Sequence, residues 1–101
     1  MKTLNGELKD FNPKMLMDSV KKNGQSLYVE VSHEDKAYYI SIHFEGIFGN
    51  ITDDTRYWVD IVSEDNEGNQ ERITGYKDWS GLTDQQVVAQ LNRWKDSLIN
   101  G

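Results

Sequence analysis

A change of hydrophobic period at position 27 constrains the fold of this chain more than any other feature of its sequence. From Leu27 onward, apolar residues such as Val29 recur at every second position, and after four polar residues the alternation resumes through Ile40. A period of two is typical of a strand with one buried face, and two such runs around a short polar turn are typical of an antiparallel hairpin. The pattern therefore predicts strands over residues 27–32 and 37–44 that share an apolar face.

Two more strands are predicted further along the chain. Residues 56–63 alternate again, with the apolar side chains of Val59 and Ile61 on one side. Residues 70–77 alternate poorly and contain Gly75, which weakens a strand because it has no side chain to pack. We therefore expect the fourth strand to lie at the edge of the sheet.

Helical signals flank the predicted sheet on both sides. Asn12 before Pro13 indicates a helix start, because the Asn side chain can accept an exposed backbone N–H and proline lacks an N–H that the first turn would leave unbonded. We expect this helix to end at Gly24. Thr83 followed by Gln86 is a capping box, which indicates a second helix that runs to about residue 100. Its buried face would carry Val87, Leu91, Trp94 and Leu98.

The expected order of elements is α-β-β-β-β-α. Consecutive strands joined by short turns form a meander, and two amphipathic helices bury their apolar sides most economically on one face of it. We therefore predict an α+β two-layer sandwich, in which a four-stranded antiparallel meander carries both flanking helices on one face. A length of 101 residues with 37% apolar residues suits a single domain over residues 1–101.

Acidic residues are concentrated in the predicted sheet. The chain has 17 Asp and Glu against 11 Lys and Arg, a formal charge of −6. Residues 30–71 hold eleven acids and two bases, a net charge of −9, so the flanking segments are slightly basic. This balance disfavours direct nucleic-acid binding, which needs clustered cations, and favours attraction of a basic partner. The same charges would also keep the protein soluble and protect the sheet edges, and both interpretations stay open.

Aromatic residues fall on the side of the strands opposite the apolar face. Tyr28, Tyr39 and Trp58 alternate there with the carboxylates of Glu30 and Asp60. Tyr and Trp are enriched at binding hot spots, and carboxylates would pair with Lys or Arg of a partner. Alternatively, the rings pack on one another across strands and stabilise the sheet by about 0.5 to 1.5 kcal/mol per pair.

These observations predict a small protein-binding module that occludes a basic surface of a protein partner, such as a surface that holds nucleic acid. The expected contact residues on the outward face are Tyr28, Glu30, Tyr39, Trp58 and Asp60. The residues expected to steer association from the turns are Asp53, Asp54, Glu64, Asp65 and Glu67. In size, lack of cysteine, acidic balance and element order, the chain resembles small inhibitors of phages and mobile elements, including anti-CRISPR proteins, and toxin-neutralising immunity proteins. No motif carries this resemblance, so it assigns no residue a role.

Two other functions stay open at this point. A homo-oligomer, such as a homodimer with a structural or accessory role, would pair through the outward face or the weak fourth strand. A small-molecule binder or enzyme would use a cleft between sheet and helices, lined by Trp79, Trp94 and Tyr76.

Several kinds of site lack their sequence signals. The chain has no cysteine, and His33 and His43 stand at no metal-ligand spacing, so we expect no metal and no cofactor. No nucleophile motif is present, so we expect no catalytic residues and no enzyme activity. No apolar run approaches the 18 residues of a membrane span, and residues 1–10 lack a signal-peptide core. We therefore expect a cytoplasmic protein without a membrane contact.

Overall fold

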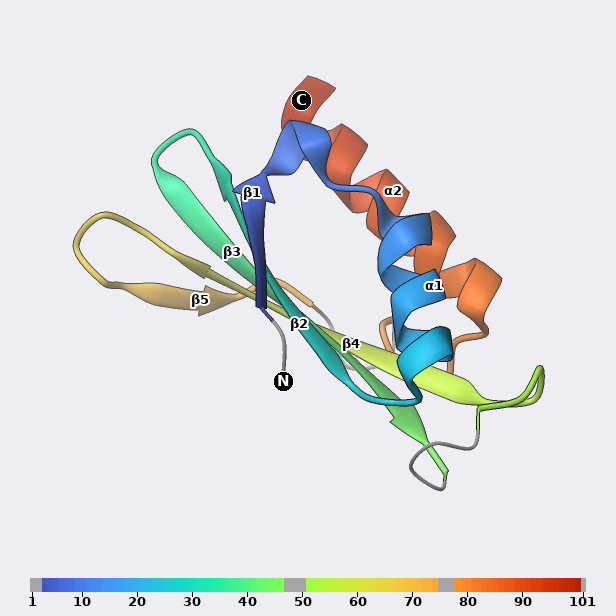
Figure 1. Ribbon diagram of the computed structural model, residues 1–101. Helices are drawn as coiled ribbons and strands as arrows, with labels where there is room; N and C mark the ends of the chain where they lie inside the picture. Colours follow the sequence, from blue (N-terminus) through green and yellow to red (C-terminus); the bar gives the residue numbers. More distant parts are fainter. Residues whose placement is uncertain (1–2, 47–50, 75–77, 101) are drawn as a thin grey trace.

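The computed structural model describes residues 3–46, 51–74 and 78–100 of the chain. These residues form an α+β fold with one mixed sheet and two α-helices. The elements are β1 (Thr3–Glu7), the short 3-10 helix η1 (Leu8–Asp10), α1 (Pro13–Asn23), β2 (Leu27–His33), β3 (Lys36–Glu45), β4 (Arg56–Glu64), β5 (Gln70–Arg72) and α2 (Asp84–Asn100). The strands follow the order β1-β2-β3-β4-β5 across the sheet, and both helices lie on the same side of it (Figure 1).

Strand β1 corrects the predicted four-stranded antiparallel meander. It pairs with β2 in parallel, with Thr3 opposite Tyr28 and Glu7 opposite Ser32, whereas the other three strand pairs are antiparallel. Parallel neighbours need a crossover connection, and η1 and α1 provide it. The sequence of β1 is Thr-Leu-Asn-Gly-Glu, whose single apolar residue gives no visible alternation. The observed order of elements is therefore β-α-β-β-β-β-α.

Both helices begin where the sequence predicts. The side-chain oxygen of Asn12 accepts two backbone N–H groups of the first turn of α1, at 3.0 and 3.2 Å. Gly24 ends that helix with a φ of 61°, a left-handed conformation that suits glycine. Before α2, the N–H of Thr83 donates to the Gln86 side chain at 2.9 Å and the Thr83 hydroxyl accepts from the Gln86 N–H at 3.2 Å. The predicted capping box is thus confirmed.

The fourth predicted strand is shorter than expected. Strand β5 spans three exposed residues at the sheet edge, and the predicted continuation over residues 75–77 lies outside the described residues. Beyond β5, the segment that leads to α2 continues the pairing with β4. The Val59 N–H donates to the Trp79 carbonyl at 2.8 Å, and Tyr57 exchanges two backbone hydrogen bonds with Leu82.

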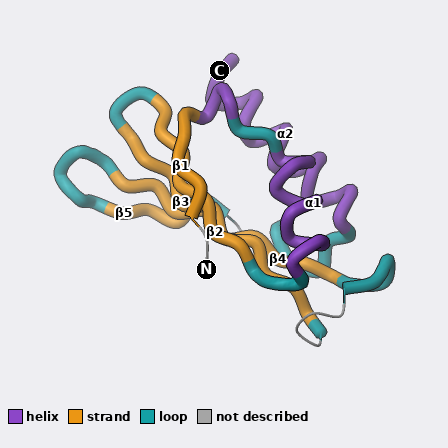
Figure 2. Tube along the Cα trace, in the orientation of Figure 1, coloured by secondary structure: helices purple, strands orange, loops and turns teal. Residues whose placement is uncertain are grey.

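The core lies between the two helices and the face of the sheet turned toward them, as the two layers in Figure 2 show. The predicted buried face of α2 is confirmed, since Val87, Leu91 and Trp94 are buried and Leu98 packs against the core. The sheet contributes the buried residues Val29, Val31, Tyr38, Ile40, Ile42, Tyr57, Val59 and Ile61. The two hairpin tips, β2–β3 and β4–β5, extend beyond the helices at one end of an elongated molecule of 39 × 25 × 22 Å (Figure 1). None of the described helices is long and apolar enough to span a membrane.

Candidate functional site

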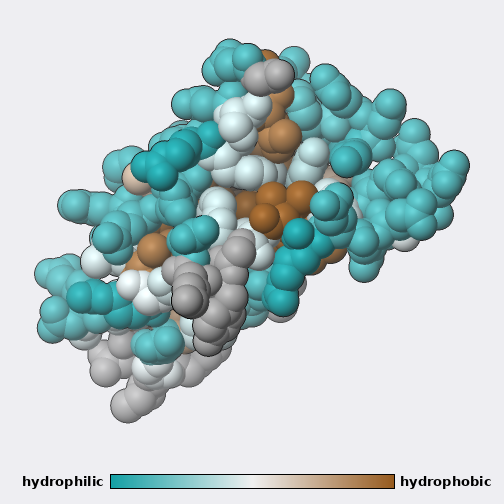
Figure 3. Space-filling view, turned by 180° about the vertical axis from the view of Figure 1, so that it is seen from behind, coloured by the Kyte–Doolittle hydropathy of each residue, from teal (hydrophilic) through white to brown (hydrophobic). Residues whose placement is uncertain are grey.

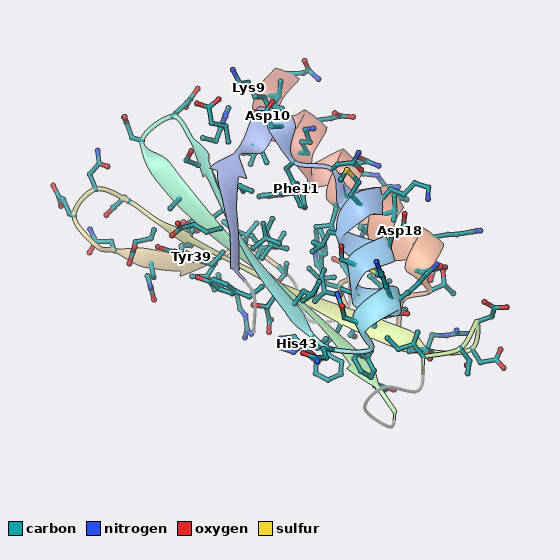
Figure 4. All side chains as sticks on the ribbon, viewed as in Figure 1. Lys9, Asp10, Phe11, Asp18, Tyr39 and His43 are labelled. Atoms are coloured by element: carbon teal, nitrogen blue, oxygen red, sulfur yellow. The ribbon has the colours of Figure 1, made fainter. Side chains whose placement is uncertain are left out.

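The outward face of the sheet brings aromatic rings and carboxylates together. Side chains alternate along a strand, so the positions between the core residues of β2, β3 and β4 point away from the helices. No helix or strand of the described part of the chain covers this surface, and Figure 4 shows Tyr39 and His43 on the side turned away from the helices. We call this surface the open face. It includes the half-buried side chains of Tyr28, Glu30, Tyr39, His43, Trp58, Asp60 and Glu64.

The rings of the open face pack against one another in two stacked pairs. Tyr28 and Tyr39 stack with ring centroids 5.9 Å apart and an interplanar angle of 20°. His43 stacks on Trp58, its direct cross-strand partner, at 5.0 Å and 16°. Cross-strand packing of the rings is therefore present, and it leaves each of the four side chains half-buried on the surface.

The hydroxyl of Tyr39 is held by acidic neighbours. It donates a hydrogen bond to Oε2 of Glu64 at 2.9 Å, and Glu30 is the direct cross-strand partner of Tyr39. Hydrogen bonding to Glu64 and then to Glu30, together with burial and the two negative charges, raises the pKa of Tyr39 far above its ordinary value of 10.0. The other oxygen of Glu64 accepts from the Gln70 side chain at 3.1 Å. Glu64 is thus a member of the open face as well as of a turn.

The carboxylate of Asp60 lies close to nitrogen atoms of two side chains within the chain itself. Nη2 of Arg72, on β5, lies 2.6 Å from one of its carboxylate oxygens, and Nε2 of His43 lies 3.8 Å from the other. Arg72 and His43 were not among the predicted site residues. The alternation of its strand does place His43 on the outward face, four positions from Tyr39, although it was not chosen as a contact residue. Arg72 depends on the register of β5, which the poor alternation of that segment hides.

The predicted steering residues lie at two opposite ends of the sheet. Ala37 pairs with Glu64 and Glu45 pairs with Arg56, so the β2–β3 tip and the β4–β5 tip lie at one end of the sheet. Figure 3 shows that hydrophilic residues cover this end. We call it the acidic end. It comprises Glu30, Glu34, Asp35, Glu64, Asp65, Glu67 and Glu71.

Asp53 and Asp54 belong to the other end, in the turn that leads into β4. Both are exposed, and the N–H of Asp54 is bonded to the Thr52 hydroxyl at 3.2 Å. Arg56, which follows this turn, donates to the Asp54 carbonyl at 3.1 Å. The sequence grouped these two residues with Glu64, Asp65 and Glu67, but the strand register separates them.

Asp65 shapes the turn of the β4–β5 hairpin. Its Oδ1 accepts the N–H groups of Glu67 and Asn69, both at 2.9 Å, and its Oδ2 accepts from the Asn69 side chain at 3.2 Å. Hydrogen bonds from Asn69, first from its backbone, lower the pKa of Asp65 below its ordinary value of 3.8. Asp65 therefore keeps its negative charge but has fewer free acceptor sites than its exposed neighbours.

The structure places the described residues of the expected cleft between sheet and helices in different surroundings. Trp94 fills the core, where its ring meets Tyr38 edge-on at 5.4 Å, and Tyr76 lies outside the described residues. Trp79 instead lines a surface hollow of about 330 Å³ beside the open face, together with Trp58 and Arg72. A bulky side chain on the buried side of an amphipathic helix goes to the core first, because burial there removes the most apolar area from water.

No family model matches the chain, and no curated protein or solved structure is significantly similar to it. Within residues 3–46, 51–74 and 78–100, no group of three or more His, Cys, Asp or Glu side chains is placed to hold a metal ion.

Proposed function

We propose that the chain is a small protein-binding module that docks its open face and acidic end on a basic surface of a protein partner and occludes it. The observation that carries this proposal is the placement of stacked aromatic pairs and carboxylates on one uncovered face. Where the basic surface normally holds nucleic acid, docking would exclude the nucleic acid, and the module would act as an inhibitor.

The two parts of this surface would have different tasks. Stacked rings such as Trp58 on His43 would offer contact area at a small entropic cost, because each ring already packs on its neighbour, and so they would slow dissociation. The carboxylates of the acidic end would speed association with a basic partner, an effect that salt screens over about 8 to 10 Å. Because Arg72 already holds Asp60, we assign the attraction to the acidic end rather than to Asp60.

The steering can be tested with a lysine- and arginine-rich peptide as the probe. In Asp35→Lys/Glu67→Lys, two exposed acids of the acidic end are reversed. Asp53→Lys/Asp54→Lys makes the same change of net charge at the opposite end of the sheet. Stopped-flow measurement at low salt should show an association rate about tenfold lower for the first variant and a much smaller decrease for the second. Equal decreases would mean that only the total charge matters, which would contradict a defined docking surface.

The occlusion can be tested by competition. The same peptide is first bound to a labelled DNA duplex, and the protein is then added at low salt. We expect release of the duplex, and we expect Trp58→Ala to release it less well because it dissociates faster from the peptide. A ternary complex of peptide, duplex and protein would contradict occlusion.

A further inference from the structure

An unpaired strand edge and an apolar hollow lie side by side at the β1 end of the sheet. Strand β1 is the last strand on its side of the sheet, so its outer edge has no strand partner among the described elements. Between β1 and α1 lies a hollow of about 240 Å³. Its floor is formed by Val29 and Val31, and its walls include Gly6, Phe11, Met15 and Ser19. Figure 4 shows Phe11 at the junction of η1 and α1, beside β1.

The hollow exists because position 6 has no side chain. Gly6 pairs with Val31, which is buried on the helix side of the sheet, so a side chain at position 6 would point toward the same layer. A Cβ atom built on Gly6 would meet nothing within 4 Å. The backbone of Gly6 does not have the positive φ that would require glycine. The local backbone therefore leaves room for a side chain at position 6 and does not itself require glycine there.

A large apolar side chain stands exposed on the wall of this hollow. Met15 on α1 has 66% of its surface exposed, the largest exposed fraction among the large hydrophobic residues described. It lies one turn before Ser19, and both line the hollow, so this side of α1 faces the β1 edge. A projecting apolar group and an apolar hollow on the same edge are complementary to each other when two copies meet about a twofold axis.

The charges along this edge are mixed, and most of them are paired within the chain. Lys9 pairs with Glu7 at 3.2 Å, and Lys14 pairs with Asp18 at 3.2 Å, while Asp10 adds one negative charge. The acidic end has no such balance, since its carboxylates outnumber the nearby bases. A basic partner would therefore bind at the acidic end. A surface of mixed charge is instead complementary to the same surface on a second copy of the chain.

We propose that this edge binds a second copy of the chain. In the dimer, β1 pairs antiparallel with β1 of the second copy about a twofold axis, which joins the two sheets into one. The Met15 side chain of each copy then enters the hollow of the other, above Val29 and Val31. Both open faces stay free, so this proposal does not rest on the proposed function.

The test is the oligomeric state of the full chain, measured by sedimentation equilibrium from about 10 to 500 μM, a range that includes the weak dimers typical of small interfaces. Gly6→Val fills the hollow with a residue that favours strands, so the monomer should remain folded with an unchanged or higher melting temperature. We expect its dimer dissociation constant to rise at least tenfold. Met15→Gln, an exposed change that keeps helix propensity, should have the same effect.

Ile99→Gln is the matched control, because Ile99 is 41% exposed on α2 and does not line the hollow. It should leave the dissociation constant unchanged. Higher salt should strengthen this dimer, since screening weakens the repulsion between two chains of charge −6, whereas it should weaken docking on a basic partner. A monomer at every concentration and salt would overturn the proposal. A dimer that survives both Gly6→Val and Met15→Gln would also overturn it, because the contact would then lie elsewhere.

Discussion

The two faces of β3 and β4 are built from the same strands but have different surroundings. On the helix side, Val59 and Ile61 are sealed in the core, while on the open face Trp58 and Asp60 remain half-exposed in a polar network. The alternation of a strand separates these two environments position by position. The comparison teaches that the buried positions are constrained by packing in the core, whereas the outward positions can change without loss of the core.

The largest difference between the faces should be in stability. Ile61→Ala removes a fully buried side chain and should lower the free energy of unfolding by about 3 kcal/mol, since the site cannot collapse fully around the cavity. Val62→Ala, the adjacent outward position, should cost about 1 kcal/mol or less. Urea denaturation measures both values. Similar losses for the two variants would contradict the division between the faces.

The contact between the two helices should stabilise the fold less in acid. Lys21 on α1 donates to Asp84 on α2 at 2.8 Å, and this hydrogen bond lowers the pKa of Asp84 below its ordinary value of 3.8. A carboxylate with a lowered pKa stabilises the fold at pH values above its ordinary pKa. This stabilisation is lost as the pH falls from the ordinary pKa through the lowered one. Because the two side chains are 43% and 39% exposed, the contribution should stay below about 1 kcal/mol.

Asp84→Asn tests this dependence. Thermal unfolding between about pH 6 and pH 2 should show that the variant loses less stability on acidification than the parent chain does. Asp65→Asn serves as a separate comparison, because the pKa of Asp65 is lowered by its own turn rather than by a contact between helices. An unchanged acid dependence in Asp84→Asn would show that the pair does not couple the helices.

The open face should stabilise the fold less in alkali, and this is the smallest of the expected effects. Because the pKa of Tyr39 is raised above its ordinary value of 10.0, the protonated phenol stabilises the fold at pH values below 10.0. This stabilisation is lost as the pH rises above that value toward the raised pKa. An absorbance titration of the phenols should show a late-ionising tyrosine that is missing in Tyr39→Phe. Tyr28 and Tyr57, whose pKa values burial raises, titrate in both proteins and provide the internal reference. If the phenol that is missing in Tyr39→Phe is one that ionises near pH 10 in the parent chain, the hydrogen bond to Glu64 is contradicted.

Short-range patterns in the sequence predicted the helices and the central strands well. Asn12 and the Thr83–Gln86 pair fix helix starts through hydrogen bonds to residues two or three positions away, so a short stretch of sequence contains all the partners. Strand β1 gave no such signal. Gly6 and the polar residues around it hide the alternation, and its partner β2 lies across an entire helix. Parallel pairing of this kind is not readable from a local pattern.

The candidate site was predictable to the extent that it depends on alternation alone. The shared face of Tyr39 and Trp58 follows from two strands with a clear period. The acidic end does not follow in this way, because the register between strands decides which turns meet. That register placed Asp53 away from Glu67 and brought Arg72 against Asp60.

The parallel attachment of β1 also has a consequence for the order of folding. Each residue of β1 pairs with a residue 25 positions further along the chain, whereas the β2–β3 and β4–β5 hairpins close over short turns. Closing the longer loop costs more entropy, so we expect the four antiparallel strands to assemble before β1 joins them. The first strand of the chain would then be the last to dock, and it could exchange on and off the sheet while the hairpins stay intact.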